Sequence, residues 1–360
     1  MTRSRIAEAA LVVIAAITLT ACSPEPERND SEERGTPESQ TSPPAGVEVI
    51  ASDLEAPWSI AFHEGTPLIS ERDSARILEL DETGAAREIG RVDGVVPNGE
   101  GGLLGIAVHE GFAYTYFTAD DENRIERFPL TGEPGSLALG DSEPVFAGIP
   151  AAGFHNGGRI AFGPDGMLYA TTGDAGARSD AQELESLAGK ILRLTPEGEA
   201  PTDNPFAGSP VYSYGHRNPQ GIAWDSDGTM YASEFGQDTW DELNLIEAGN
   251  NYGWPEVEGI AQDESFVDPV QQWEPAEASP SGIAITDQTI HVANLRGQRL
   301  RDIPLAELGE SSERLDGEYG RLRDVVVAPD GSLWVLTNNT DGRGNPGPND
   351  DRVLRVPAAP

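Results

Sequence analysis

A histidine lies among glycines in the segment Gly153–Arg159, GFHNGGR, directly before an expected β-hairpin. The chain has five histidines and 24 Lys and Arg against 61 Asp and Glu, so positively charged groups are scarce. Histidine has a pKa near neutrality and can act as a general base. His155 is therefore a candidate base, although a structural or loop histidine is an alternative that this segment alone leaves open.

Arginines occupy corresponding places in two other segments that lead into apolar strands. Arg217 lies in YGHRN, and Arg321 and Arg323 begin RLRDVVV. Any one of them could be a surface residue or an ion-pair partner. Their occurrence at matching positions favours a common pocket. A positive pocket in a chain of net charge −37 indicates a multiply anionic ligand.

Carboxylates gather in the segment EFGQDTWDELNLIEAGNNYGWPEVEG. Its acidic residues and its glycine-rich turns offer oxygen atoms of the kind that Ca²⁺ binds, although the spacing is not that of an EF-hand. A solvated loop is the alternative in so acidic a chain. The candidate oxygen donors are Asp238, Asp241, Glu242 and Glu258.

An internal repeat must position these residues. Each copy has an apolar strand similar to GIAF, a turn that often contains Asp-Gly, and a second and third strand. The irregular spacing of about 40 to 65 residues favours an all-β, six-bladed β-propeller of four-stranded antiparallel blades, with a two-domain sandwich as the alternative. The strand at Val47 is placed to complete the last blade and close the ring. The six copies begin at Pro57, Gly102, Gly157, Pro219, Pro280 and Leu322.

The residues before each first strand should converge near the propeller axis. We therefore expect one face of the axial opening to carry the candidate base and the arginines together. The converging segments contain Glu100, His155, Arg217, Ser279, Arg321 and Arg323.

The chain ends divide into three predicted regions. Residues 1–22 are typical of a lipoprotein signal peptide, in which Cys22 ends the lipobox-like Leu19–Cys22 and would be acylated, with an ordinary secretory signal as the alternative. Residues 23–46 are rich in Pro, Glu and Ser and are predicted to be a disordered tether. Residues 47–360 form the predicted propeller domain. The protein should be extracytoplasmic and lipid-anchored, with no other membrane contact and no nucleic-acid partner.

The motifs spread over residues 47–357 resemble those of the glucose/sorbosone dehydrogenase family, and most closely its aldose sugar dehydrogenase branch. They are GEGGLLGIA, FHNGGRIAFGPDGMLYATTGD, AGKILRLTPEGEAPTDNPF, YSYGHRNPQGIAWD, DELNLIEAGNNYGWP and RLRDVVVAPDG. This resemblance implies a six-bladed propeller that binds Ca²⁺ and pyrroloquinoline quinone (PQQ), a cofactor with three carboxylates.

The resemblance also implies roles for individual residues. His155 matches the base that removes a proton from the C1 hydroxyl of the sugar. Arg217 and Asn218 match a pair that holds the quinone oxygens, and Arg321 and Arg323 match a carboxylate clamp. Other cofactor contacts are predicted at Glu100, Glu258 and Asn294, and calcium ligands at Glu242, Tyr252, Gly236 and Gln237.

Three positions depart from the family pattern. Glu100 replaces a glutamine that touches the cofactor, and its carboxylate would repel the quinone unless it is protonated or bound to calcium. Phe154 replaces the aspartate of the glucose-oxidising branch, which argues against a strong glucose preference. Gly236-Gln237 replaces a Gly-Pro pair, and a lysine of the clamp has no evident match.

These observations predict a PQQ- and Ca²⁺-dependent dehydrogenase that oxidises aldoses at C1 to lactones and passes the electrons to an external acceptor. The expected oligomeric state is a monomer or a homodimer. Two alternatives are a non-catalytic carbohydrate-binding propeller and a calcium-dependent lactonase-type propeller, which would hydrolyse lactone without reducing a redox dye.

Overall fold

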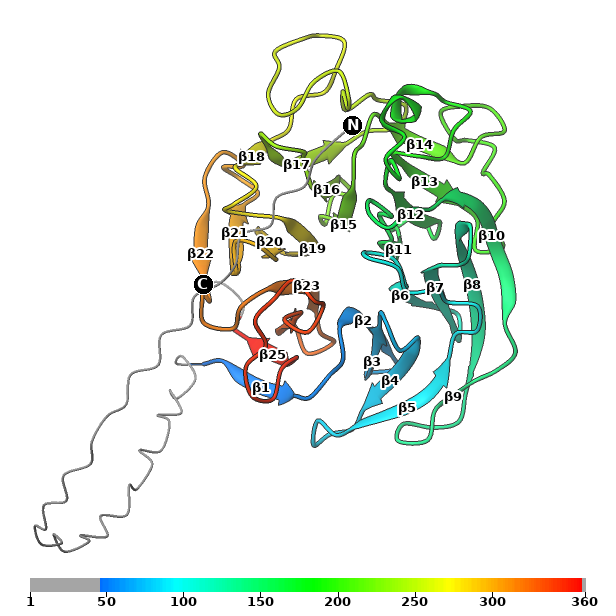
Figure 1. The fold of residues 1–360 in the computed structure, drawn as a ribbon, viewed down its shortest axis with the longest axis vertical. Coiled ribbons are helices and arrows are strands. Elements are labelled where there is room, and N and C mark those ends of the chain that lie inside the picture. Colours follow the sequence, from blue (N-terminus) through cyan, green and yellow to red (C-terminus); the bar gives the residue numbers. More distant parts are fainter. Residues whose placement is uncertain (1–45, 358–360) are drawn as a thin grey trace, which may run out of the picture. The chain divides into compact units, whose positions relative to one another are not determined.

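Six antiparallel sheets surround a common axis in the computed structural model, which describes residues 46–357 (Figure 1). The predicted signal peptide with Cys22, and the tether apart from its last residue, lie outside the described residues. Each sheet is one blade, and the blades follow one another along the chain. The six-bladed propeller predicted from the repeat is therefore confirmed, and the two-domain sandwich is excluded.

The first three blades come from residues 57–214. Blade 1 contains β2 (Pro57–His63), β3 (Thr66–Glu71), β4 (Arg76–Leu80) and β5 (Ala86–Arg91). Blade 2 contains β6 (Leu103–His109), β7 (Phe112–Thr118), β8 (Glu122–Thr131) and β10 (Glu143–Pro150), with the short β9 (Ala138–Leu139) paired to β8. Blade 3 contains β11 (Ile160–Phe162), β12 (Leu168–Thr172), β13 (Lys190–Leu194) and β14 (Val211–Tyr214), with the 3₁₀ helix η1 (Arg178–Gln182) between β12 and β13.

The last three blades complete the ring. Blade 4 contains β15 (Pro219–Trp224), β16 (Met230–Glu234), β17 (Asp241–Ile246) and β18 (Gln271–Trp273). Blade 5 contains β19 (Pro280–Thr286), β20 (Thr289–Asn294), β21 (Arg299–Pro304) and β22 (Ser312–Arg314). Blade 6 contains β23 (Leu322–Val327), β24 (Leu333–Thr337), β25 (Val353–Val356) and, as its outer strand, β1 (Glu48–Ala51).

The ring closes through β1, as the sequence predicted. This strand pairs antiparallel with β25, and Glu48 lies opposite Arg355, whose guanidinium contacts the Glu48 carboxylate at 2.9 Å. Residues from the two ends of the described chain thus share one sheet. The closure leaves no unpaired strand between the first and last blades.

The hydrophobic core is divided among the blade interfaces. Each pair of neighbouring blades encloses its own cluster of buried apolar side chains, such as Leu68, Leu103 and Phe117 between blades 1 and 2. The glycine of the GIA repeat permits this close approach. A Cβ atom on Gly221 would lie 2.3 Å from the carbonyl oxygen of Ser281 in the next blade. In the copies that carry it, at Gly105, Gly221 and Gly282, this glycine is therefore required for packing against the next blade.

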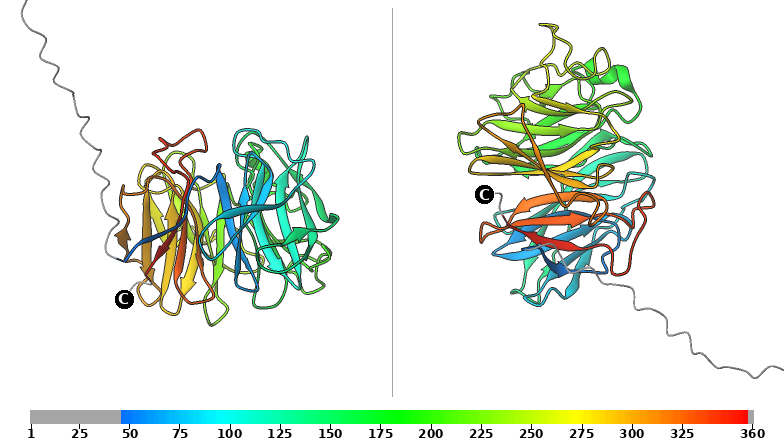
Figure 2. Two further views of the ribbon diagram at one scale, coloured as in Figure 1. Left: turned by 90° about the horizontal axis from the view of Figure 1, so that it is seen from below. Right: turned by 90° about the vertical axis from the view of Figure 1, so that its left-hand side faces the viewer.

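The first strand of each blade, β2, β6, β11, β15, β19 or β23, lies nearest the axis (Figure 1). The side views show the strands running across the thickness of the ring (Figure 2). Side chains that precede these strands therefore gather at one end of the axis. No helix among residues 46–357 has the length and apolar composition needed to cross a bilayer.

Candidate functional site

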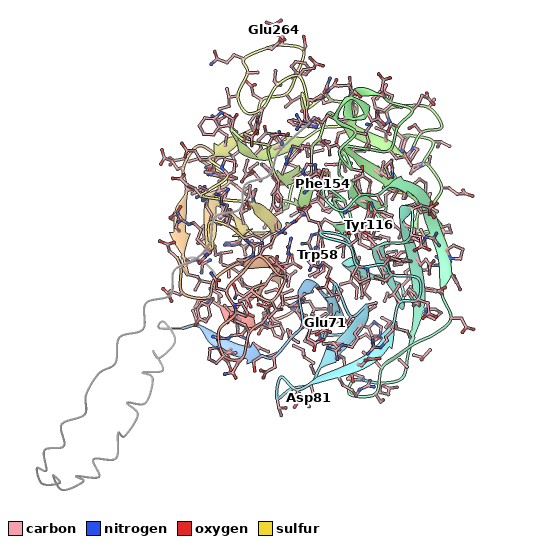
Figure 3. The ribbon with its side chains drawn as sticks, in the orientation of Figure 1. Trp58, Glu71, Asp81, Tyr116, Phe154 and Glu264 are labelled. Carbon is pink, nitrogen blue, oxygen red and sulfur yellow. The ribbon has the colours of Figure 1, made fainter. Side chains whose placement is uncertain are left out.

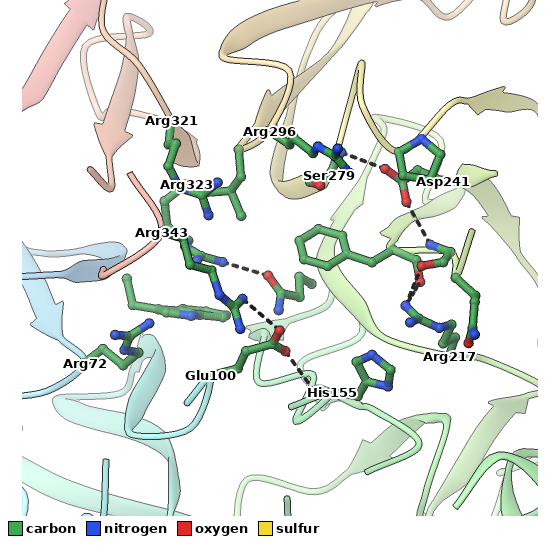
Figure 4. Close-up of a pocket in the computed structure, with 17 residues that line it drawn as sticks. Arg72, Glu100, His155, Arg217, Asp241, Ser279, Arg296, Arg321, Arg323 and Arg343 are labelled. Atoms are coloured by element: carbon green, nitrogen blue, oxygen red, sulfur yellow. Dashed lines mark hydrogen bonds and ion pairs between the residues drawn. The ribbon is translucent and has the colours of Figure 1, made fainter. Parts of the chain in front are cut away.

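A central cavity of about 280 Å³ lies where these segments meet. Four residues that the repeat predicted at the axis, His155, Arg217, Arg321 and Arg323, all line it (Figure 4). Trp58 and Phe154 are near the middle of the ring in the same region (Figure 3). The other lining residues are Trp58, Arg72, Glu100, Gln220, Phe235, Gly236, Gln237, Asp241, Pro275, Ser279, Leu295, Arg296 and Arg343.

The cavity is rich in positive charge. Its lining includes six arginines but only two carboxylates, those of Glu100 and Asp241. Within residues 46–357, every arginine except Arg178, Arg217 and Arg296 forms an ion pair with a carboxylate. Arg217 and Arg296 line this cavity, and Arg178 lines a neighbouring one. In the part of the chain that the structure describes, the guanidinium groups without a carboxylate partner are thus concentrated around one site.

Arg321 and Arg323 share one acidic partner. Asp341 Oδ2 is 3.1 Å from Arg321 Nη2 and 3.8 Å from Arg323 Nη2. Arg323 also donates hydrogen bonds to Gln220 Oε1 at 2.8 Å and to Asn338 Oδ1 at 3.1 Å. Burial, with the nearby arginine charges, lowers the pKa of Arg323 to about 9. A second anionic group in the cavity would stabilise this guanidinium in its charged form.

His155 is held from both its backbone and its side chain. Its φ of 56° lies in the left-handed region, which is uncommon for a residue with a Cβ. The His155 N–H donates to Glu100 Oε2 at 2.9 Å, and Nδ1 lies 2.7 Å from Asp174 Oδ1. With a proton on Nδ1 facing this carboxylate, Nε2 carries the free lone pair. That nitrogen is the one available to accept a proton from a ligand in the cavity.

Asp174 is the partner that orients the imidazole. It is fully buried, and its Oδ2 accepts a hydrogen bond from Trp254 Nε1 at 2.9 Å. Burial acts to raise the pKa of Asp174, but hydrogen bonds from His155, the Gly176 N–H and Trp254 outweigh it and lower the pKa below its usual value. Asp174 is therefore ionised at neutral pH and can stabilise a protonated His155.

For the sugar oxidation that the sequence predicts, we expect Asp174→Asn to lower kcat by roughly tenfold to a hundredfold, less than the full 10²- to 10⁴-fold contribution typical of a general base. An amide has one acceptor oxygen, so it cannot accept from His155, the Gly176 N–H and Trp254 in the present geometry, and it carries no charge to stabilise an imidazolium. Steady-state kinetics with saturating cofactor test the expectation, and thermal unfolding checks that the variant is folded. An unchanged kcat in the folded variant would contradict the orienting role.

Arg217 lies beside His155 and reaches across the cavity wall. Its Nη1 donates to the carbonyl oxygens of Phe235, at 3.1 Å, and of Gly236. Its guanidinium carbon lies 5.4 Å from the centre of the Trp254 ring, and its Nε is buried without a hydrogen-bond acceptor among the described residues. Burial lowers the pKa of Arg217. The guanidinium is thus positioned by carbonyl groups but keeps a donor unused.

A second cavity, of about 310 Å³, adjoins the first at His155 and Arg217. One wall carries Phe154, which is 47% exposed and meets the His155 ring edge-on at 4.7 Å. Such an exposed aromatic surface beside polar groups is suited to a small ligand with both apolar and hydroxyl-bearing faces. The remaining lining residues are Asp174, Gly176, Arg178, Gln237 and Asp238.

Lys190 supports the segment that carries Arg178. Its buried Nζ donates to the carbonyl oxygens of Asp180 at 2.8 Å, Ala181 at 3.0 Å and Ala188 at 2.5 Å. Burial lowers the pKa of this ammonium to about 8. The Lys190 ammonium group therefore supplies the hydrogen bonds that water would otherwise donate to these three carbonyl oxygens.

This lysine predicts a pH dependence of stability. The folded-state pKa of about 8 lies below the unfolded value of 10.5, so the unfolded chain binds more protons between these pH values. The unfolding free energy of the parent protein should therefore rise by up to roughly 3 kcal/mol from pH 8 to pH 10.5, relative to that of Lys190→Met. Urea titrations of both proteins across this range measure the difference. Parallel pH profiles would contradict the prediction.

The predicted calcium ligands do not form one cluster. Gly236 and Gln237 line the central cavity, but the Gly236 carbonyl accepts from Arg217. Glu242 is buried behind the cavity, where it accepts from Gly259 N at 2.6 Å and burial raises its pKa to about 8. The Tyr252 hydroxyl donates to Leu245 O at 2.8 Å, whereas the atom expected to bind calcium is the Tyr252 carbonyl oxygen. Residues 46–357 contain no group of three or more His, Cys, Asp or Glu side chains arranged to hold a metal ion.

Three predicted cofactor contacts lie outside the lining of the central cavity. Asn218 accepts from Gly157 N at 3.0 Å, and its buried Nδ2 has no acceptor among the described residues. Asn294 Nδ2 donates to Val292 O at 2.9 Å at the end of β20. Glu258 Oε1 accepts the backbone N–H groups of residues 237–240. In this arrangement Glu258 fixes the loop beside the cavity instead of entering it, because four convergent donors hold its carboxylate.

Several cavity residues escaped the sequence reasoning. Arg72, Asp174 and Arg296 each follow the second strand of a blade by one or two residues, and Arg343 lies farther along such a loop. In an antiparallel pair, the end of the second strand lies at the same sheet edge as the start of the first. The positions after each second strand were therefore a usable signal for residues at the axial opening.

Comparisons with known proteins identify the relatives of this chain. Residues 54–346 match the family model described as Glucose / Sorbosone dehydrogenase. The chain is 30% identical over 344 residues to the aldose sugar dehydrogenase YliI of Escherichia coli, covering 82% of this chain and 91% of the relative. It is 33% identical over 261 residues to quinoprotein glucose dehydrogenase B of Acinetobacter calcoaceticus, covering 61% and 54%.

A solved structure extends the match to the whole propeller. The PQQ-bound aldose sugar dehydrogenase of Streptomyces coelicolor is 52% identical, with a TM-score of 0.83 over 87% of this chain and 99% of that chain. The resemblance found in the sequence motifs is thereby confirmed. The chain belongs to the glucose/sorbosone dehydrogenase family.

Proposed function

We propose that this protein oxidises aldose sugars at C1 to lactones with PQQ as its cofactor. Its family and its aldose sugar dehydrogenase relatives make it an oxidoreductase that acts on sugar CH–OH groups. The observation that carries the finer proposal is the position of His155. Its imidazole, oriented by Asp174, lies at the junction of a cation-rich cavity and an open cavity with an exposed aromatic wall.

The residues of the central cavity fit a cofactor with three carboxylates. Arg217 and Arg321 each bury an Nε without an acceptor among the described residues, and Arg323 is a buried guanidinium whose pKa is lowered. These groups gain stabilisation from an anionic ligand. We assign Arg321, Arg323 and Arg296 to its carboxylates and Arg217, with Asn218, to its quinone oxygens. When bound there, PQQ supplies the two-electron acceptor for the hydride from the sugar.

The residues of the chain supply proton transfer and orientation. His155 Nε2 removes the proton of the C1 hydroxyl as the C1 hydride departs. Asp174 keeps the imidazole in the required tautomer and stabilises its protonated form. Arg217 places positive charge beside the reacting groups, where exclusion of water by the sugar strengthens it. Phe154 offers an apolar face to the sugar ring in the second cavity.

Calcium and the external electron acceptor are further parts of the proposal. We propose that Gly236 and Gln237 would offer carbonyl oxygens to a Ca²⁺ ion, and that Glu242 and Tyr252 would hold a second ion. We further propose that the electrons pass to an acceptor outside the protein.

Dye reduction with a panel of aldoses, after addition of PQQ and Ca²⁺, tests the function. We expect reduction of the dye with appearance of the corresponding lactone, and no reduction without PQQ. Binding of PQQ without oxidation of any aldose would contradict the proposed reaction. Binding of sugars without binding of PQQ would favour a non-catalytic carbohydrate-binding propeller, and lactone hydrolysis without dye reduction would favour a lactonase.

We also propose that Cys22 anchors the protein to the outer side of the cytoplasmic membrane, because it ends the apolar run of a signal peptide. Cys22→Ser should release the protein into the soluble fraction and abolish incorporation of labelled palmitate. Membrane retention of that variant would contradict the anchor.

A further inference from the structure

Glu100 is one of the two carboxylates that line the cation-rich central cavity. It lies in the turn before β6 and is joined to the His155 segment in both directions. The Glu100 N–H donates to Gly153 O at 3.0 Å, and Glu100 Oε2 accepts from the His155 N–H at 2.9 Å. The preceding Gly99 has a φ of 63°, and a Cβ there would lie 2.1 Å from Gly153 O. The two segments are therefore in close backbone contact.

This contact acts at a strained residue. His155 adopts a φ of 56°, a conformation that a residue with a Cβ keeps only when its surroundings hold it. Asp174 fixes the imidazole but not the peptide group. The Glu100 carboxylate is the acceptor that holds the His155 N–H in this conformation. The positional role therefore belongs to the acceptor oxygen of this side chain, which an amide in the same place would also supply.

A negative charge at this place has an electrostatic cost for an anionic ligand. Arg343, from the loop after the second strand of blade 6, offsets that charge, since its Nη1 lies 2.8 Å from Glu100 Oε1 (Figure 4). Arg343 belongs to the loop after β24, and its N–H donates to Asp341 Oδ1 at 2.9 Å. The same Asp341 pairs with Arg321. The loop is thus tied to the arginines of the cavity at one end and to Glu100 at the other.

The ionisation of Glu100 agrees with this arrangement. Burial acts to raise the pKa of Glu100, but the His155 N–H and the positive charge of Arg343 outweigh it and lower the pKa. The carboxylate is therefore charged at neutral pH.

We propose that Glu100 positions His155 through its backbone N–H, and that Arg343 supplies the counter-charge that lets an anionic cofactor bind beside this carboxylate. The inference rests on the proposed function for the identity of the cofactor. The contribution of Arg343 to PQQ affinity should therefore depend on the negative charge of Glu100.

A double-mutant cycle of PQQ affinity, measured by fluorescence titration without sugar, tests the counter-charge. We expect Arg343→Gln to weaken PQQ binding about tenfold, because Glu100 is left unneutralised. Arg343→Lys should bind within about threefold of the parent, since it keeps the charge. Glu100→Gln should bind at least as tightly as the parent, and Glu100→Gln/Arg343→Gln within about threefold of Glu100→Gln.

A tenfold loss from Arg343→Gln in both backgrounds would overturn the counter-charge, because Arg343 would then act on the cofactor directly. No loss in either background would overturn it as well. Arg355→Gln is the matched control. Arg355 is a similarly exposed arginine that pairs with Glu48 on the outer edge of blade 6, and its replacement should leave the affinity unchanged.

Hydrogen exchange of the cofactor-free protein tests the positioning role separately. The amide of His155 should exchange at least tenfold faster in Glu100→Ala, whereas Glu100→Gln, which keeps an acceptor oxygen, should remain protected. With saturating PQQ, Glu100→Ala should lower kcat about tenfold with little change in KM, and Glu100→Gln should restore most of it. Equal protection in all three proteins would overturn the role. If the parent failed to bind PQQ, the proposed function would fall while this exchange result still decided the positioning of His155.

Discussion

Replacement of His155 by glutamine lowers kcat for aldose oxidation by roughly 10²- to 10⁴-fold, the range expected for loss of a general base, while PQQ affinity changes little. Glutamine can occupy the space beside Asp174 but cannot take up a proton from the C1 hydroxyl. His155 lines both cavities, and its Nε2 is free to accept a proton because Nδ1 faces Asp174. Steady-state kinetics with saturating PQQ and Ca²⁺, together with a PQQ titration, measure the two quantities.

The matched control for this variant is His63→Gln, at the end of β2 and outside the lining of both cavities. It should retain the parent kcat. Retention of more than about a tenth of the parent kcat by His155→Gln would place the base elsewhere. A large loss of PQQ affinity in that variant would mean that His155 serves chiefly in cofactor binding.

Replacement of Arg323 by methionine weakens PQQ binding about a hundredfold, as expected when one member of a buried charged pair is removed. Arg323 is 5% exposed and is held by Gln220 and Asn338, so no other side chain can take its place without displacing these contacts. Asp341 keeps Arg321 as its partner in the variant. Titration with PQQ in the absence of sugar measures the loss.

The same variant should not lose stability in the cofactor-free state. Burial and the neighbouring Arg72, Arg159 and Arg321 lower the pKa of Arg323 to about 9, so its charge is costly until an anion binds. Urea unfolding of the cofactor-free protein should therefore show an unchanged or higher midpoint. Arg301→Met is the control, because Arg301 is equally buried but pairs with Glu313 in blade 5. A loss of affinity that merely follows a loss of stability would contradict a direct role for Arg323.

The family relationship also gives meaning to two of the departures found in the sequence. Phe154 is an exposed side chain that forms a wall of the second cavity, so a sugar there meets an aromatic face instead of a carboxylate. Glu100 carries a negative charge, but Arg343 neutralises it within hydrogen-bonding distance. The charge of Glu100 is therefore paired inside the same cavity.

The sequence by itself determined the propeller, its closure by β1, and the convergence of His155, Arg217, Arg321 and Arg323. These features follow from a repeated local pattern. Each copy encodes the same strands, and three of the six copies share a glycine for close packing, at Gly105, Gly221 and Gly282. Equivalent positions in a ring must lie at equivalent distances from the axis. A histidine and three arginines at matching places could therefore be brought together without knowledge of any contact.

The tertiary structure alone decided which partners these residues meet. The loops after the second strands differ in length and sequence, so no repeat locates Asp174 beside His155 or Arg343 beside Glu100. The sequence likewise predicted that Glu258 contacts a ligand. In the structure, its carboxylate instead accepts hydrogen bonds from the four backbone N–H groups of residues 237–240. Such pairings depend on distances between residues far apart in the chain. Closure of the ring fixes those distances, whereas the local sequence fixes only the strands that make closure possible.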